Sequence, residues 1–256
     1  MRNTFLIFRH ELRMLVIAPS TYVASVLFLA LMALVYWSIV RDLTLVASED
    51  LPTTEFFRNF WFPCLFVVPL LTMKSLAEER RTGTLSTLLT TQVGPGAVVV
   101  GKFLAAYILY CGLWALTMIF PQIFLWRQPD ASFGGQLLDW APVLGGLSFV
   151  WFSGLLFIAV GIFASSLTRS QLVAGMLTFT LLFLIIVLAN LLNNIPLGLE
   201  NSGLTQLLNE PLAYLRITQH LEDFSRGIFD SRPVFYYSSM SALLLALASI
   251  NVEARA

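Results

Sequence analysis

The fold of this chain is decided by residues 140–199, which read WAPVLGGLSFVWFSGLLFIAVGIFASSLTRSQLVAGMLTFTLLFLIIVLANLLNNIPLGL. Arg169 is the one charged residue in this stretch, and it separates an uncharged run of 29 residues, Trp140–Thr168, from one of 30 residues, Ser170–Leu199. An α-helix needs about 20 apolar residues to cross the hydrocarbon core of a membrane. The stretch therefore predicts two membrane-spanning helices that are joined by a tight turn.

Four further uncharged runs continue this pattern along the chain. They cover residues 14–40, Asn59–Met73, Phe103–Trp126 and Pro233–Val252. The run from Asn59 has only 15 residues, but Lys74 at its end can extend its ammonium group toward the headgroups while the helix continues. We predict an all-α integral membrane protein, one polytopic domain over residues 1–256 with six transmembrane helices. The predicted spans lie near residues 21–40, 59–76, 103–125, 143–167, 172–192 and 234–250.

The composition excludes several other classes of protein. Hydrophobic residues make up 57% of the chain and charged residues 12%, which is about half the charge of a soluble globular domain. The formal net charge is zero, so the chain has no basic surface that would attract nucleic acid. Cys64 and Cys111 both lie in apolar runs and do not indicate a disulfide framework. The apolar runs are continuous and do not alternate, which excludes an outer-membrane β-barrel.

The N-terminal residues 1–17 have a different pattern from the spans. Phe5, Phe8, Leu12 and Leu15 recur at helical spacing, which indicates an amphipathic helix. We expect this helix to lie in the headgroup plane before the first span. The alternative is that it forms the beginning of that span. A cleaved signal peptide is disfavoured because the apolar run that follows is too long.

The distribution of basic residues predicts the orientation of the chain. With the N-terminus inside, nine of the 15 basic residues lie on the inner side. They are Arg2, Arg9, Arg13, Lys74, Arg80, Arg81, Lys102, Arg169 and Arg255. Because inner segments are enriched in Lys and Arg, both termini are predicted to be cytoplasmic.

The predicted inner loop, residues 77–101, has a sequence pattern that differs from that of a simple connector. It begins with a charged half-turn at Glu78–Arg81, breaks at Gly83, and continues with leucines at helical spacing until Pro95 and two glycines. A charged elbow followed by a small amphipathic helix suits docking to a soluble partner. If the loop docks such a partner, we expect the charged elbow to lie in a partly desolvated interface, where Glu79 is the candidate for a charged pair. The alternative is an ordinary solvated loop.

This loop closely resembles the loop after the second span of ABC-2-type permeases, the membrane subunits of a large class of ABC transporters. The matching residues are Ala77, Glu78, Glu79, Arg80, Gly83, Thr84, Leu85, Leu88, Leu89, Pro95, Gly101 and Lys102. Two positions depart mildly from the family pattern, Ser86 and Gln92. The segment Ser165–Gln171 is similar to the family's turn between the fourth and fifth spans. Near the C-terminus, His220, Glu222, Phe224, Arg226, Gly227 and Asp230 match the gliding-motility-associated branch.

The resemblance implies an exporter-type permease subunit with the ABC-2 fold. It implies two copies of an ATP-binding subunit and a second permease copy or paralogue as partners; an auxiliary envelope protein and membrane lipid are further partners that this interpretation allows. The chain carries no G-x-x-x-x-G-K-[ST] loop, so ATP and Mg²⁺ are expected to bind to the partner subunit. The residues expected to couple the chain to that subunit are Glu78, Glu79, Arg80, Gly83, Thr84, Leu85, Leu88, Leu89, Thr168, Arg169 and Ser170. No catalytic, cofactor-binding or metal-ligating residue is expected in the chain itself.

Other functions remain as alternatives. A secondary transporter or channel is disfavoured because the assigned spans contain no charged residue except the terminal Lys74. An intramembrane hydrolase built on Ser148 is disfavoured because neither His10 nor His220, which are the chain's only histidines, lies in a span. His220 and Glu222 are too few for a metal site.

Two further features have a structural and a functional reading. Gly154, Gly161 and Ser165 share one helix face and would let another helix approach closely, either within the chain or across a dimer. The outer segment, residues 193–232, contains His220, Glu222, Arg226 and Gly227. It would either form a lid over a transport path or pack the ends of two spans.

Overall fold

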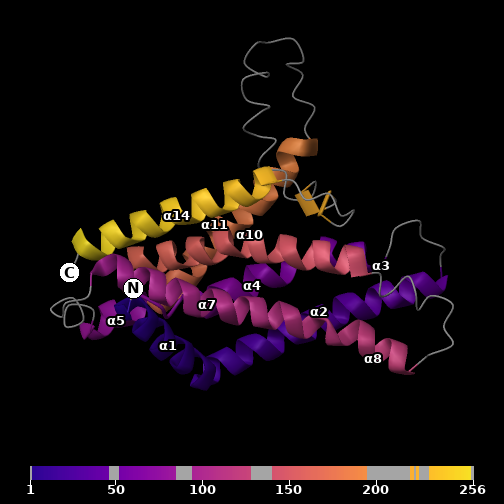
Figure 1. Cartoon of the computed structure of the whole chain (residues 1–256), viewed down its shortest axis with the longest axis horizontal. Helices are drawn as coiled ribbons and strands as arrows, with labels where there is room; N and C mark the ends of the chain where they lie inside the picture. Colours follow the sequence, from indigo (N-terminus) through magenta and orange to yellow (C-terminus); the bar gives the residue numbers. More distant parts are fainter. Residues whose placement is uncertain are drawn as a thin grey trace, which may run out of the picture.

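The computed structural model describes residues 2–45, 52–84, 94–127, 140–194, 220–221, 223–224 and 231–254. The elements of this part of the chain are α-helices (Figure 1). They are α1 (Arg2–Ile17), α2 (Pro19–Leu45), α3 (Pro52–Arg58), α4 (Trp61–Thr72), α5 (Ala77–Thr82), α7 (Pro95–Thr117), α8 (Ile119–Arg127), α10 (Trp140–Leu167), α11 (Gln171–Asn194) and α14 (Ser231–Ala254).

Five stretches of the described chain are helical, long and apolar enough to cross a membrane. They are Pro19–Arg41, Trp61–Thr82, Pro95–Ile123, Pro142–Leu167 and Ser231–Ala254. In α11 the described apolar stretch, Gln171–Ile186, is shorter, so the fifth predicted span, residues 172–192, stays a prediction. The chain is therefore a multi-pass helical protein.

Helix α10 lies at the centre of the bundle. It packs against α14, α11, α7, α4 and α3, and α1 packs along α7. Figure 1 shows the long helices α2, α7, α10 and α14 running along the long axis of the molecule, with the two chain ends near α5. The bundle thus has one end that contains α5 and an opposite end that contains α3.

The second span is not the single helix that the sequence predicts. Helix α4 covers only 12 residues, which is about 18 Å of the roughly 30 Å hydrocarbon core. A turn at residues 73–76 follows, and then α5 begins. Pro69 lies inside α4, and most of the helix is buried among its neighbours, as a membrane helix with internal prolines requires.

The third span begins earlier than predicted, which changes the position of Lys102. Gly94 is the extended N-cap and Pro95 occupies the first turn of α7, where a proline costs no hydrogen bond. Lys102 therefore lies two turns inside a membrane-spanning helix and is 3% exposed. A buried charged residue thus lies in α7 just ahead of the predicted span boundary at residue 103.

Helix α1 is amphipathic, and one of its faces packs on α7. A Cβ at Gly101 would lie 2.8 Å from Cγ2 of Ile7 and 3.3 Å from the backbone nitrogen of Phe8, so only glycine permits this close approach. Large apolar side chains of α1 remain exposed: Phe5, Leu6, Met14, Val16 and Ile17. This pattern is typical of an interfacial helix, but the position of α1 in a headgroup plane stays a prediction.

The end of the bundle that contains α3 is built from aromatic side chains, and we call it the aromatic end. Its members are Tyr36, Phe56, Phe57, Phe60, Trp114, Phe120, Phe149, Phe224 and Tyr237. Phe60 meets Phe149 edge to face, with ring centroids 5.3 Å apart. Helix α3 was not predicted, because Glu55 and Arg58 interrupt the uncharged runs.

Candidate functional site

Helix α5 receives its N-terminal cap from a distant helix. Leu76 at the N-cap position makes no side-chain cap hydrogen bond. Instead, the backbone N–H groups of Leu76 and Ala77 each donate to Oγ of Ser165 in α10, at 3.0 Å. Ser165 is fully buried. Because unpaired N–H groups at a helix start are costly when buried, this serine fixes the beginning of α5 to the central helix.

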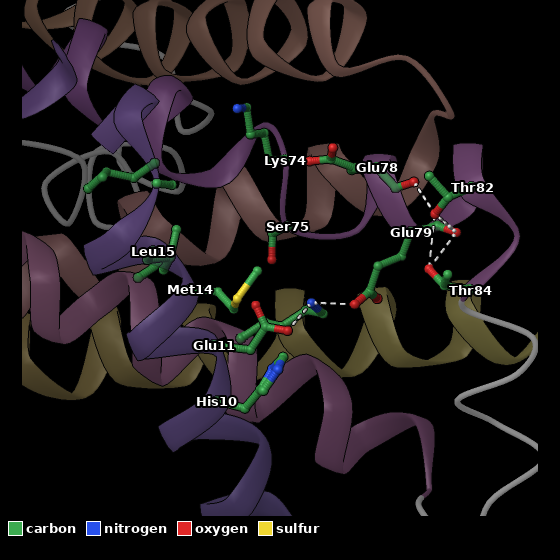
Figure 2. A pocket seen from close by; sticks show the side chains of 14 residues that line it. His10, Glu11, Met14, Leu15, Lys74, Ser75, Glu78, Glu79, Thr82 and Thr84 are labelled. Carbon is green, nitrogen blue, oxygen red and sulfur yellow. Dashed lines mark hydrogen bonds and ion pairs between the residues drawn. The ribbon is translucent and has the colours of Figure 1, made fainter. Parts of the chain in front are cut away.

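Lys102 joins α5 to α1 and α7. Its Nζ lies 2.6 Å from Oε1 of Glu11 in α1 and 2.8 Å from Oε1 of Glu79 in α5, as the dashed lines in Figure 2 show. Glu11 is 20% exposed and Glu79 is 18% exposed. A buried ammonium is tolerated only when it is paired. The three residues therefore hold three segments of the chain in one arrangement.

The C-terminal helix α14 forms a third attachment to α5. Nη2 of Arg80 donates to the backbone oxygen of Asn251 at 2.9 Å. Nδ2 of Asn251 in turn donates to the backbone oxygen of Ser166 at 2.8 Å and to its Oγ at 3.1 Å. Arg80 is thus connected through α14 to the last turn of α10.

The end of α5 depends on a glycine. Gly83, where the sequence predicts a break, is the C-cap with φ +74° and ψ 4°. This left-handed conformation favours glycine because it has no Cβ. Thr84 folds back so that its Oγ1 lies 3.0 Å from Oγ1 of Thr82. The side chain of Thr84 therefore lies beside the last residue of α5.

We call this region the polar end; its members are Glu11, Ser20, Lys74, Glu78, Glu79, Arg80, Lys102, Ser165, Ser166 and Asn251. A pocket of about 300 Å³ opens between α1, α5 and α7 (Figure 2). It is lined by His10, Glu11, Met14, Leu15, Ala18, Leu71, Lys74, Ser75, Glu78, Glu79, Thr82, Thr84, Lys102 and Ala106.

The structure brings two predicted coupling segments to the same end of the bundle. Helix α5, with Glu78, Glu79 and Arg80, contacts both α10 and α11, and residues 168–170 form the turn between those helices. In this turn the N–H of Ser170 donates to Oγ1 of Thr168 at 3.0 Å, and Arg169 is exposed. Leu85, Leu88 and Leu89 lie outside the described residues.

Glu79 has an ionic partner within the chain. Its Oε1 lies 2.8 Å from Nζ of Lys102, and a pair with a charge on a docked subunit stays a prediction. Arg81 and Thr84 are exposed at the surface of this region. A partner that docks here would therefore contact exposed residues around α5 more directly than the buried carboxylate.

The glycines of α10 are in contact with other helices of the same chain. A Cβ at Gly154 would lie 2.3 Å from Cε1 of Tyr110 in α7. A Cβ at Gly161 would lie 2.2 Å from Oγ1 of Thr72 in α4. Together with Ser165, they allow α10 to approach its neighbours closely within the bundle.

The described part of the outer segment packs on the aromatic end. Nδ1 of His220 lies 3.3 Å from the hydroxyl of Tyr237, and Phe224 meets Phe149 with ring centroids 6.0 Å apart. Glu222, Arg226 and Gly227 lie outside the described residues. Within the described part of the chain, no group of three His, Cys, Asp or Glu residues could hold a metal ion.

Sequence reasoning missed three residues of the polar end. Glu11 and Asn251 lie far along the chain from α5, and Lys102 was placed just outside a span. The one sequence signal for Lys102 is the pair Gly101–Lys102, in which the glycine permits the contact with α1. No sequence signal identifies Asn251 as the contact of Arg80.

The comparison with protein families supplies the class of this helical bundle. The family model for ABC-2 family transporter proteins matches residues 5–253. The chain belongs to the ABC-2 transporter family. ABC-2 permeases are membrane transport components that are not themselves catalytic, and they generally work with an ABC ATP-binding subunit. Among curated proteins, none matches the sequence.

Proposed function

We propose that this ABC-2 protein is the permease subunit of an ATP-driven exporter in a bacterial inner membrane, where it moves a substrate or transmits force across the membrane. The observation that supports this proposal is the attachment of α5. Helix α5 is held by Ser165 of α10, by Lys102 of α7 and through Arg80 by α14. A surface helix that is tied to several spans transmits a displacement, whereas a loosely attached loop absorbs it.

In this proposal the ATP-binding subunit docks at α5 and at the turn of residues 168–170. Two copies of that subunit bind ATP and Mg²⁺, and they act on a pair of permease chains, either two copies of this chain or this chain with a paralogue. The resemblance to the gliding-motility-associated branch supports an auxiliary envelope protein as a further partner.

The polar end is proposed to face the cytoplasm together with both termini. The two chain ends, α5 and the α10–α11 turn lie at this end (Figure 1). Arg80, Arg81, Lys102 and Arg169 are there as well, and inner segments of membrane proteins are enriched in basic residues.

Copurification tests the docking site. The tagged chain is isolated from native membranes in mild detergent, and an ATP-binding subunit is expected to copurify with it. Arg81→Glu reverses an exposed charge on α5 and is expected to lower the recovery of that subunit while chain insertion stays normal. Gly83→Pro fixes φ near −65° and cannot adopt the C-cap conformation, so it is expected to retain part of the docking but lose transport-linked ATP turnover. Ser231→Ala, an exposed residue at the opposite end, is the control.

Wild-type recovery and ATP turnover in both α5 variants would show that α5 is not the docking site.

Orientation is tested separately with single cysteines at Thr84, Ser170 or Ser231 in a Cys64→Ala, Cys111→Ala background. In intact cells an impermeant thiol reagent is expected to label Ser231→Cys only. Labelling of Thr84→Cys without Ser231→Cys would reverse the proposed orientation.

A further inference from the structure

Two opposite charges in the pocket at the polar end have no ionic partner among the residues that the structure describes. Lys102 is bonded to Glu11 and Glu79, but Lys74 and Glu78, one helical turn apart on the same pocket wall, form no ion pair with each other or with any other described residue. Nζ of Lys74 donates to Oγ of Ser20 at 3.0 Å. Both side chains are partly buried. The pocket therefore presents one cationic and one anionic group that are available to a ligand.

The pocket lies near the beginning of the candidate span Pro19–Arg41. Ser20, which Lys74 contacts, is in the first turn of α2, where the apolar span Pro19–Arg41 begins. Leu71 of the pocket wall is in the last turn of α4. The adjoining α1 exposes Met14, which also lines the pocket, at 56% of its surface. The same opening is thus bordered by exposed apolar side chains of α1 and by charged groups close to the beginning of a candidate span.

The size and lining of the pocket select the class of ligand. Its volume of about 300 Å³ is at the lower end of ligand pockets, so it suits a headgroup and not a whole lipid. Met14, Leu15 and Leu71 would contact the first carbons of the lipid, and Ser75 and Thr82 add hydroxyl groups. Figure 2 shows Lys74 and Glu78 along one side of the pocket and Met14, Glu11 and His10 along the other.

We propose that this pocket binds the zwitterionic headgroup of a phospholipid with a primary amine, with the phosphodiester at Lys74 and the ammonium at Glu78. A phosphate accepts charge-assisted hydrogen bonds from a lysine, and a primary ammonium donates them to a carboxylate. A quaternary ammonium has no N–H to donate, and an anionic headgroup would leave Glu78 unpaired beside Glu79. The pocket therefore distinguishes phospholipid headgroups by their amine group as well as by their phosphate.

The lipid site does not require the proposed docking of an ATP-binding subunit, although Glu78 lies in the docking helix α5. A segment of that subunit is the rival occupant, because Thr82 and Thr84 also line the pocket. The position at the beginning of α2 and the exposed apolar side chains of α1 favour the lipid.

Lipid binding to the purified full chain tests the proposal. Delipidated protein in mild detergent is titrated with dioleoylphosphatidylethanolamine, dioleoylphosphatidylcholine or dioleoylphosphatidylglycerol, and bound lipid is counted by native mass spectrometry. The ethanolamine lipid is expected to bind about tenfold more tightly than the other two, since a hydrogen bond to a charged group accounts for roughly this factor. Soluble glycerophosphoethanolamine distinguishes a free headgroup from a membrane lipid, and it is expected to compete only weakly because it lacks the acyl chains.

Two pocket variants and one control test whether Glu78 and Lys74 bind the headgroup. Glu78→Gln is expected to abolish the preference for ethanolamine while the binding of all three lipids persists. Lys74→Gln is expected to weaken the binding of all three by about tenfold. Glu253→Gln changes an exposed charge of α14 outside the pocket and is the control, with wild-type binding. Thermal unfolding of lipid-free samples verifies that each variant is folded.

Equal binding of the three lipids to the wild type, or wild-type selectivity in both pocket variants, would refute the site. Complete displacement of the bound ethanolamine lipid by the ATP-binding subunit would assign the pocket to that subunit instead. The recovery of the ATP-binding subunit is measured on Glu78→Gln and Lys74→Gln as well, so failure of the lipid site and failure of the docking proposal give different results.

Discussion

The polar end and the aromatic end of this bundle are held together by different interactions. At the polar end, Lys102, Ser165 and Asn251 make directional contacts at 2.6–3.1 Å between helices. At the aromatic end, rings such as Phe60 and Phe149 pack 5.3–6.3 Å apart between centroids. In lipid, burying an apolar ring gains little over leaving it in contact with acyl chains, so the aromatic contacts act through packing.

Because of this difference, we expect the two ends to tolerate amino-acid substitutions differently. Removal of one partner from a buried ionic contact leaves the other partner unpaired, which costs several kcal/mol. Rings contact many atoms and no single contact is essential, so the aromatic end is sensitive to added volume more than to lost polarity. Four substitutions test this contrast.

The largest effect is expected from Lys102→Met at the polar end. It leaves the carboxylates of Glu11 and Glu79 buried without their cation, and it should lower the free energy of unfolding by about 3–5 kcal/mol. Denaturant unfolding of the purified chain in mild detergent measures this. The triple variant Lys102→Met, Glu11→Gln, Glu79→Gln removes all three charges and should recover most of the loss. A single variant as stable as the wild type would mean that the cluster is solvated.

At the aromatic end, Gly146→Ala should cost about 1–3 kcal/mol through overpacking. The added Cβ would lie 2.2 Å from Cδ2 of Phe57 and 2.5 Å from its Cγ. Gly112→Ala in α7 is the matched control, because no atom lies within 4 Å of its Cβ; the helix propensity of alanine should stabilise it by up to about 1 kcal/mol. The same unfolding measurement compares them, and equal stabilities would contradict the close packing of α10 on Phe57.

Ser165→Ala should destabilise the chain by about 1–2 kcal/mol, since two N–H groups of α5 lose their acceptor. Hydrogen exchange should accelerate at Leu76 and Ala77, which donate to Ser165. Ser153→Ala is the control, because Ser153 is equally buried in α10 but donates to Val150 of its own helix. Unchanged exchange at Leu76 in the Ser165 variant would show that α5 is not held by this cap.

The smallest effect is expected from Glu55→Gln at the aromatic end. The pair of Glu55 with Arg58 is 3.8 Å long, and both side chains are about 40% exposed. Exposed pairs of this kind are screened by water and salt, so the change should stay within about 0.5 kcal/mol. A loss comparable to that of Lys102→Met would remove the distinction between the two ends.

The sequence alone determined that the chain is a multi-pass helical membrane protein, and it predicted the position of two of its long helices closely. Predicted spans 143–167 and 21–40 correspond to α10 (Trp140–Leu167) and α2 (Pro19–Leu45). These boundaries are predictable because the backbone of an uncharged run must satisfy its own hydrogen bonds in lipid, which only a continuous helix does. The break after α5 was also predictable, since Gly83 is the residue type that a left-handed C-cap requires.

The tertiary structure decided which of these helices touch and what α5 is attached to. Lys102 and Glu11 are 91 positions apart, Leu76 and Ser165 are 89 apart, and Arg80 and Asn251 are 171 apart. Hydropathy and local spacing report the length of a helix, but they do not report which face meets which neighbour. A lysine two turns inside an apolar helix would be costly without an ionic partner. Lys102 is stable there because the folded bundle places two carboxylates within 3 Å of it.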